Sequence, residues 1–289
     1  MITFQAGGPT SDYQKHLDST GGGRFDGQIV LVDSVADRTG FWPGSVQVGP
    51  DGRLYVSVGA NCDSCNTGSV QAGSLVSYAL DGSDRRVVAT GLRNPWDFAW
   101  QPGTNDLWIV DSGRVVPGAM TMDGPPDELN RVIAGANYGF PYCSGDRTPV
   151  ADLRSPSRDY CTDTQAPSFV FTSQSSPSGI VFYPYDGFPF WKNDLIVVLH
   201  GSWYRPEPAG YALVVVQFGK DHRPDGSLEV IAPTTENPVF QRPLAGFSLA
   251  GMGFFPYHPV DVVVSAEGWL YVSVEEGRIF RFRPRPAAK

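Results

Sequence analysis

Arg93 and Asn94 are the neighbouring residues best suited to bind a charged ligand, and they stand just before a predicted strand. Arginine donates several hydrogen bonds from a planar group, and asparagine adds an amide donor and acceptor. In β-proteins such polar residues gather in loops at strand ends, where a rigid sheet positions them for binding. The stretch 91–141 is therefore the predicted centre of the functional site. The structural alternative is that Arg93 forms an ion pair with Asp97 or Asp111 and only ties the sheets together.

Four cysteines fall into two groups, Cys62 with Cys65 in a C-x-x-C pattern, and Cys143 with Cys161. A C-x-x-C pattern occurs in zinc half-sites, redox pairs and small disulfide loops. Zinc needs about four ligands, and the second group lacks the matching spacing. A redox motif normally begins a helix, whereas this one follows a predicted strand. We expect two structural disulfides, with free thiols and a metal site as the alternatives; disulfides would indicate an exported protein.

The sequence contains no other catalytic constellation. It has no G-x-S-x-G nucleophile elbow, no H-E-x-x-H, and no glycine pattern for phosphates or dinucleotides. The formal charge of −8 argues against a nucleic-acid partner, because phosphate binding needs a basic face. No apolar run reaches the roughly 18 residues that a membrane helix requires.

The composition indicates an all-β protein. Thirty-three glycines and 25 prolines make up about a fifth of the 289 residues, well above the usual share of roughly 12%. Helix-length amphipathic patterns are nearly absent, so the excess marks many tight turns between short strands. The segment 1–24 is polar and glycine-rich, and we expect it to be poorly structured.

A local unit recurs four times along the chain: an apolar strand, a turn, and a second strand that begins with leucine. These second strands are predicted at residues 54–58, 107–110, 195–199 and 270–274. Their spacing is irregular while the local pattern is constant, which indicates blades of one design separated by long insertions. This is the signature of a β-propeller. We predict a single propeller domain over residues 1–289, with about four to five blades represented.

Four motifs lie at the ends of these strands. They are Gly91-Leu92-Arg93-Asn94-Pro95, Asp127-Glu128-Leu129-Asn130 with Asn137-Tyr138-Gly139-Phe140-Pro141, Leu199-His200-Gly201-Ser202-Trp203-Tyr204-Arg205, and Pro259-Val260-Asp261-Val262. At these residues the chain resembles the soluble quinoprotein glucose/sorbosone dehydrogenase family, over roughly residues 41–284. The resemblance implies a six-bladed β-propeller that binds pyrroloquinoline quinone (PQQ) with calcium and oxidises sugars in the periplasm. Judged by the family's length, about two blades of N-terminal sequence are expected to be absent.

The resemblance also implies which residues contact the cofactor. Arg93 and Asn94 match the family's pair, whose cation and amide face the quinone oxygens. Trp203 and Arg205 are expected to stack on a planar ligand, or alternatively to cover the edge of a blade. His258 stands where the family has an arginine that grips the tricarboxylate cofactor, and a histidine would hold it more weakly.

The loop that contains Gly113 and Arg114 matches the family loop whose backbone carbonyls bind calcium. Because any residue can supply a carbonyl, the sequence is equally compatible with a plain turn, which needs no metal. His200 lies in an apolar run, and we expect it to be a hydrogen-bonded structural residue rather than part of the site.

Two further departures from the family affect the chemistry. The family's general-base histidine heads a His-x-x-Gly stretch, and here that place reads Phe41-Trp42-Pro43-Gly44. Phenylalanine cannot take the proton of a sugar hydroxyl as hydride leaves for the quinone. The acidic side chain that often follows the strand equivalent to residues 54–58 is replaced near Ala60-Asn61.

Two functions remain open on the sequence. The first is a PQQ-dependent aldose or sorbosone dehydrogenase that acts on a small-molecule sugar in the periplasm or outside the cell. The second is a non-catalytic propeller of the same descent that serves in binding or assembly. In that case a protein partner would cover an incomplete propeller edge.

Overall fold

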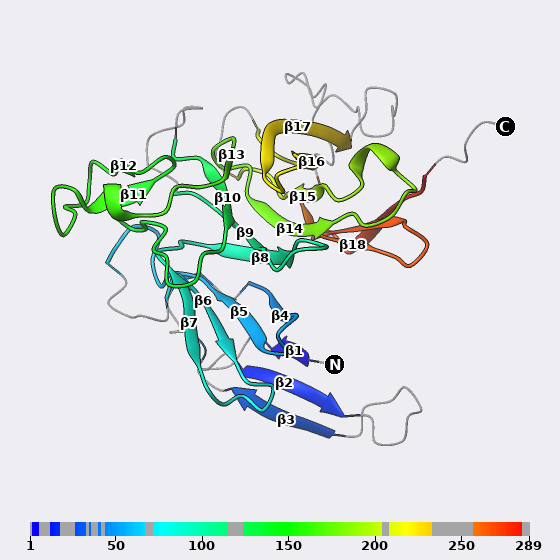
Figure 1. The fold of residues 1–289 in the computed structure, drawn as a ribbon, viewed down its shortest axis with the longest axis horizontal. Helices are drawn as coiled ribbons and strands as arrows, with labels where there is room; N and C mark the ends of the chain where they lie inside the picture. The colour runs from blue at the N-terminus through cyan, green and yellow to red at the C-terminus, as the bar shows by residue number, and fades with distance from the viewer. Residues whose placement is uncertain are drawn as a thin grey trace. The chain divides into compact units, whose positions relative to one another are not determined.

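The structure is a computed structural model of an all-β chain (Figure 1). It describes residues 2–5, 12–17, 27–32, 35, 40–41, 44–66, 72–114, 124–203, 208–232 and 257–284. The chain forms two compact units, which are described in turn: Met1–Trp96 with Val132–Ala166, and Asp97–Arg131 with Pro167–Lys289. Within the described ranges, no helix has the length and apolar character needed to cross a membrane.

The first unit contains two antiparallel sheets and a short hairpin. The three-stranded sheet consists of β1 (Ile2–Gln5), β2 (Asp12–Leu17) and β3 (Gly27–Val32). The four-stranded sheet follows chain order through β4 (Val46–Val48), β5 (Leu54–Val58), β6 (Ser74–Tyr78) and β7 (Arg86–Thr90). The hairpin pairs β11 (Cys143–Ser144) with β12 (Thr148–Pro149) and is followed by a 3-10 turn, η1 (Tyr160–Asp163).

Strands β1 and β2 lie in the segment 1–24, for which the sequence analysis expected little structure. They pair with each other and with β3, in a register that aligns Ile2 with Lys15 and Lys15 with Ile29. This order therefore depends on pairing with a strand further along the chain, which local composition does not predict.

The second unit contains three antiparallel sheets (Figure 1). One has the order β13-β10-β9-β8, made of β8 (Pro95–Trp100, which enters this unit at Asp97), β9 (Leu107–Asp111), β10 (Asp127–Arg131) and β13 (Phe169–Phe171). The next runs through β14 (Pro177–Phe182), β15 (Leu195–Leu199), β16 (Ala212–Phe218) and β17 (Pro224–Ala232), with the 3-10 turn η2 (Pro189–Trp191) between β14 and β15. The last consists of β18 (Pro259–Val264), β19 (Leu270–Val274) and β20 (Arg278–Phe282).

Strand β15 shows how these sheets pack. Its five residues are all buried. Leu195, Val197 and Leu199 join a core cluster with β9, β10, β14 and β16. Ile196 and Val198 point to the opposite face, into a second cluster with β18 and β19. Because successive side chains of a strand alternate between faces, this apolar run places β15 between two packed layers, as expected for stacked blades.

The predicted second strands are confirmed as β5, β9, β15 and β19, each second in its sheet. The all-β propeller-type fold predicted from the sequence is therefore confirmed. The prediction of a single domain over residues 1–289 stays a prediction.

Candidate functional site

The segment that carries Arg93 and Asn94 is held between two loops of the first unit. The amide of Phe140 donates to the carbonyl of Gly91 (2.9 Å), and the amide of Ala60 donates to the carbonyl of Arg93 (2.7 Å). Gly91 adopts φ +70°, and a Cβ at this position would lie 2.0 Å from Asn137 Oδ1. The segment therefore requires glycine here, and it delivers Arg93 and Asn94 to a fixed place.

The guanidinium of Arg93 is almost fully buried, with 7% of the side chain exposed. It forms an ion pair with the carboxylate of Asp63 through Nη2, and its Nε donates to the Asp63 carbonyl (3.2 Å). The ring of Phe41 lies on the guanidinium, 4.4 Å from its central carbon. Asp97 and Asp111, the partners considered from the sequence, belong to the other unit.

Asp63 was not among the site residues predicted from the sequence, in which the family's acid was expected to be replaced near Ala60 and Asn61. The C-x-x-C pattern is the sequence feature that could have pointed to Asp63, because the Cys62–Cys65 disulfide closes a short loop that contains this residue. An acid three residues after Ala60 is thereby brought back to Arg93.

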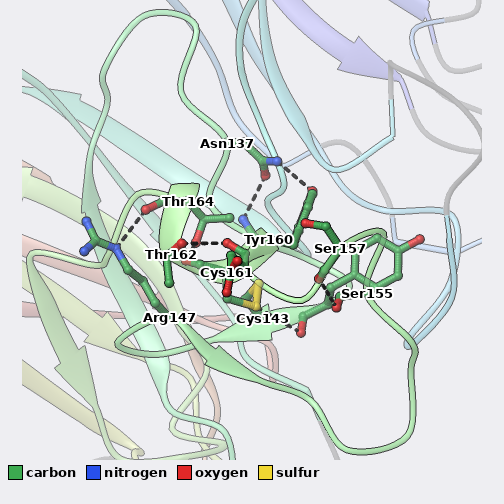
Figure 2. Close-up of a disulfide and its surroundings, with 12 residues drawn as sticks. Asn137, Cys143, Arg147, Ser155, Ser157, Tyr160, Cys161, Thr162 and Thr164 are labelled. Atoms are coloured by element: carbon green, nitrogen blue, oxygen red, sulfur yellow. Dashed lines mark hydrogen bonds between the residues drawn. A yellow bond between two sulfur atoms is a disulfide. The ribbon is translucent and has the colours of Figure 1, made fainter.

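The Cys143–Cys161 disulfide links the β11–β12 hairpin to η1 (Figure 2). Asn137 Nδ2 donates to Tyr160 Oη (2.7 Å), and Asn137 Oδ1 accepts from the amide of Gly139 (2.9 Å). Gly91 packs against residues 137–139, which Asn137 connects to this disulfide-linked region through Tyr160. Both predicted disulfides are confirmed, and none of the four cysteines is a free thiol.

In the second unit, Gly113 and Arg114 follow β9 in a largely buried loop. Asp127, which is fully buried, accepts from the amide of Gly113 (2.7 Å) and from the amide of Ser176 (2.7 Å). A Cβ on Gly113 would lie 2.3 Å from the carbonyl oxygen of Pro126. The loop thus places backbone carbonyls close together. Over the described ranges, no group of three or more His, Cys, Asp or Glu side chains could hold a metal, so a cation here would need carbonyl ligands.

His258 lies in an aromatic cluster of the same unit. Trp203 stacks on it, with ring centroids 4.0 Å apart and planes 16° apart, and the rings of His200 and Tyr211 lie at 4.6 and 4.8 Å. Trp203 is 61% exposed, so this cluster presents an open aromatic surface. Arg205 lies outside the described residues.

The tautomer of His258 follows from its hydrogen bond. Its Nδ1 lies 3.2 Å from the carbonyl oxygen of His200. Because a carbonyl only accepts, Nδ1 carries the proton and Nε2 carries the lone pair. Burial, and then the neighbouring His200, lower the pKa of His258 below its ordinary value, which favours this neutral form. His200 itself lies 3.2 Å from the carboxylate of Glu275, through Nε2.

The predicted site residues therefore fall into two groups. Arg93 and Asn94 share one segment of the first unit, whereas Trp203 and His258 are in direct contact in the second unit, which also contains the Gly113 loop. Their roles in cofactor binding stay predictions.

Comparison with known proteins identifies relatives of this fold. The model of the family "Glucose / Sorbosone dehydrogenase" matches residues 24–200, and the model "Strictosidine synthase-like, N-terminal" matches residues 244–282. An uncharacterized protein of Borreliella burgdorferi is 25% identical over 218 residues, covering 72% of this chain and 51% of that protein. The aldose sugar dehydrogenase YliI of Escherichia coli is 29% identical over 122 residues, covering 40% of this chain and 29% of YliI. The chain thus spans about half the length, or less, of these relatives.

Solved structures of low sequence identity share the fold. A Trichoderma reesei protein of the carbohydrate-active enzyme family AA12 superimposes with a TM-score of 0.76 at 19% identity, over 98% of this chain and 80% of the other. The holo PQQ domain of pyranose dehydrogenase from Coprinopsis cinerea gives 0.67 at 19% identity, over 97% and 78%. The apo form of the soluble aldose sugar dehydrogenase from Escherichia coli gives 0.65 at 18% identity, over 98% and 77%.

Proposed function

Because the chain belongs to the glucose/sorbosone dehydrogenase family, a family of sugar oxidoreductases, we propose that it is a PQQ-dependent aldose or sorbosone dehydrogenase. The observation that carries the proposal is the buried guanidinium of Arg93, held beside Asn94 on a braced segment. Its substrate is a small sugar, and the two disulfides support a periplasmic or extracellular location.

The donor chemistry of Arg93 and Asn94 fits an anionic quinone. A guanidinium binds carboxylates and quinone oxygens through charge-assisted hydrogen bonds, and the neighbouring amide adds a further donor. The carboxylate of Asp63 that pairs with Arg93 is about half exposed, so this ion pair borders solvent, where an anionic ligand can approach the guanidinium. When bound, PQQ supplies the two-electron acceptor for hydride from the sugar.

In the second unit, Trp203 offers its exposed face to a planar ring, and Arg205 adds a cation by sequence. His258 binds a carboxylate well only when Nε2 is protonated, because the neutral tautomer presents a lone pair there. We therefore expect it to hold the cofactor more strongly as the pH falls.

Calcium fits the donor type of the Gly113 loop, since it prefers oxygen ligands and accepts backbone carbonyls. The carbonyl oxygens of Pro125 and Pro126 lie 3.0 and 2.3 Å from the place of a Cβ on Gly113. The backbone carbonyls of Gly113 and Arg114 would be the ligands of the calcium ion.

A second candidate function is a non-catalytic binding or assembly module. Phe41 lies directly on Arg93, so the residue that replaces the family's base is packed against the proposed cofactor site. Moreover, among the residues that the structure describes, the sheet of β18, β19 and β20 has three strands and the other two sheets of this unit have four, and Ile279 on β20 is 72% exposed. A protein partner would cover this edge.

Reconstitution separates the two functions. The purified chain is titrated with PQQ in the presence of calcium, binding is followed by cofactor absorption, and reduction of a dye is then measured with a panel of aldoses. The dehydrogenase predicts binding at micromolar cofactor and aldose-dependent dye reduction. Absence of binding at that concentration would favour the non-catalytic module.

A further inference from the structure

Asp63 places a carboxylate on Arg93, the residue that also contacts Phe41, and Phe41 stands where the family has its general-base histidine. Its carboxylate pairs with Arg93, and the guanidinium of Arg93 lies on the ring of Phe41. We propose that Asp63 accepts the proton of the sugar hydroxyl during oxidation. The inference rests on the proposed function and names a catalytic residue for the same site.

The surroundings of Asp63 fix its position relative to both neighbours. The amide of Phe41 donates to the carbonyl of Ala60 (2.8 Å), and the amide of Ala60 donates to the carbonyl of Arg93 (2.7 Å). Gly59 has no room for a side chain, because a Cβ would lie 2.5 Å from that of Phe41. The disulfide between Cys62 and Cys65 then closes the loop, so Asp63 cannot swing far from Arg93.

Asp63 also has the capacity to take a proton. Its Oδ1 accepts from Arg93, while Oδ2 has no hydrogen-bond partner within the described part of the chain. The side chain is 49% exposed, so a substrate hydroxyl can reach it. Arg93 then orients the carboxylate in the way that a third group orients the base in other catalytic arrangements.

The proposed step is balanced in atoms and electrons. Asp63 would take the proton as the O–H bond at C1 of the aldose breaks, and bound PQQ would be the acceptor for the hydride, with both bonding electrons, from the C1–H bond. C1 and its oxygen become a carbonyl, so an aldose gives a lactone. Asp63 afterwards releases its proton to water, through its exposed side.

The test compares Asp63→Asn with the unchanged chain, both loaded with PQQ and calcium. Asparagine keeps the size of the side chain but cannot act as the base. We expect kcat to fall by about 10²- to 10⁴-fold, while the PQQ affinity measured by absorption is unchanged or increases, because Arg93 loses a competing anion. Asp146→Asn is the matched control, since Asp146 is exposed in the same unit, and it should leave both quantities unchanged.

A second variant guards against a merely structural effect. Asp63→Ala should be rescued by added formate, a small carboxylate that can take the proton, whereas Asp146→Ala should not respond to it.

The outcomes distinguish the inference from the proposed function. If the unchanged chain oxidises aldoses and Asp63→Asn does so at the same rate, the assignment of Asp63 is overturned and the dehydrogenase stands. Loss of PQQ binding in Asp63→Asn would likewise overturn it, by showing that Asp63 only supports the cofactor site. If the unchanged chain binds no PQQ, both the proposed function and the assignment fail.

Discussion

A nearly buried guanidinium needs an anionic partner, and Arg93 has one in Asp63. The energetic cost of leaving such a charge unpaired is large, so a bound cofactor anion is expected to share Arg93 with Asp63. The affinity of this chain for PQQ is therefore expected to respond to changes on either side of that ion pair.

Substitution of Arg93 tests the first group of predicted contacts. Arg93→Lys keeps the charge but loses the planar fork, so we expect PQQ affinity to fall roughly ten- to a hundredfold, as for the loss of a charged hydrogen bond of about 1.5–3 kcal/mol. Absorption titration measures the affinity. Arg86→Lys, at an exposed arginine of the same unit, is the control, and equal affinities of the two variants would contradict the predicted contact.

If His258 contacts the cofactor as proposed, cofactor affinity is expected to depend on pH. Burial and His200 lower its pKa, so the imidazole is neutral at pH 7 and gains its charge only below its ordinary range. We expect PQQ affinity to rise as the pH falls through that lowered pKa. Glu275, Glu276, His200 and Tyr211 are the titratable groups that face it.

His258→Arg should remove this dependence and strengthen binding at pH 7, because arginine stays charged throughout. His222→Arg, in an exposed turn, is the control and should keep the pH response. Identical pH profiles for the unchanged chain and His258→Arg would contradict the role of His258.

At the scale of elements, loops rather than strands hold the proposed contacts in place. The Cys143–Cys161 disulfide closes 18 residues and Cys62–Cys65 closes three. In the chain-entropy model, the longer loop stabilises the fold by about 3 kcal/mol and the shorter by roughly half of that.

Double serine variants of each disulfide test this difference. We expect Cys143→Ser with Cys161→Ser to lower the urea midpoint more than Cys62→Ser with Cys65→Ser. The latter variant should instead lower kcat, since it releases the loop of Asp63. A larger loss of stability from opening the short loop would contradict this division of roles.

The Gly113 loop predicts a calcium response. A Cβ at Gly113 would collide with the carbonyl of Pro126, so Gly113→Ala should abolish the increase in thermal midpoint that calcium gives the unchanged chain. Gly103→Ala is the control, because a Cβ there meets no atom within 4 Å while its positive φ is still strained. It should lower the midpoint and keep the calcium response. A calcium response that survives in Gly113→Ala would exclude this loop as the site.

The strands could be predicted from the sequence because their signal is local. Leu54-Tyr55-Val56-Ser57-Val58 combines β-branched and aromatic residues between turns, and it forms β5 as expected. The partner of Arg93 could not be predicted in this way, because Asp63 reaches it only through a disulfide-closed loop. The aromatic cluster around His258 could not be predicted in this way either, because it joins residues as far apart in the sequence as His200 and His258.

At the scale of the whole molecule, family membership and fold do not by themselves establish the activity of this chain. The family model covers residues 24–200, and solved structures at about 19% identity share the fold. Sequence identity at this level supports the arrangement of strands. It does not supply the family's base, whose place is taken by Phe41, or the family's arginine, whose place is taken by His258. Sugar oxidation by this chain therefore depends on its own residues, among which Asp63 is the proposed base.

The most direct measurement is a single turnover of the PQQ-loaded chain without oxygen or dye. We expect an aldose to bleach the oxidised-quinone absorption in proportion to bound cofactor, and to do so more slowly when C1 carries deuterium in place of hydrogen. Binding of PQQ without an absorption change for any aldose would show that the chain is not a PQQ-dependent sugar dehydrogenase.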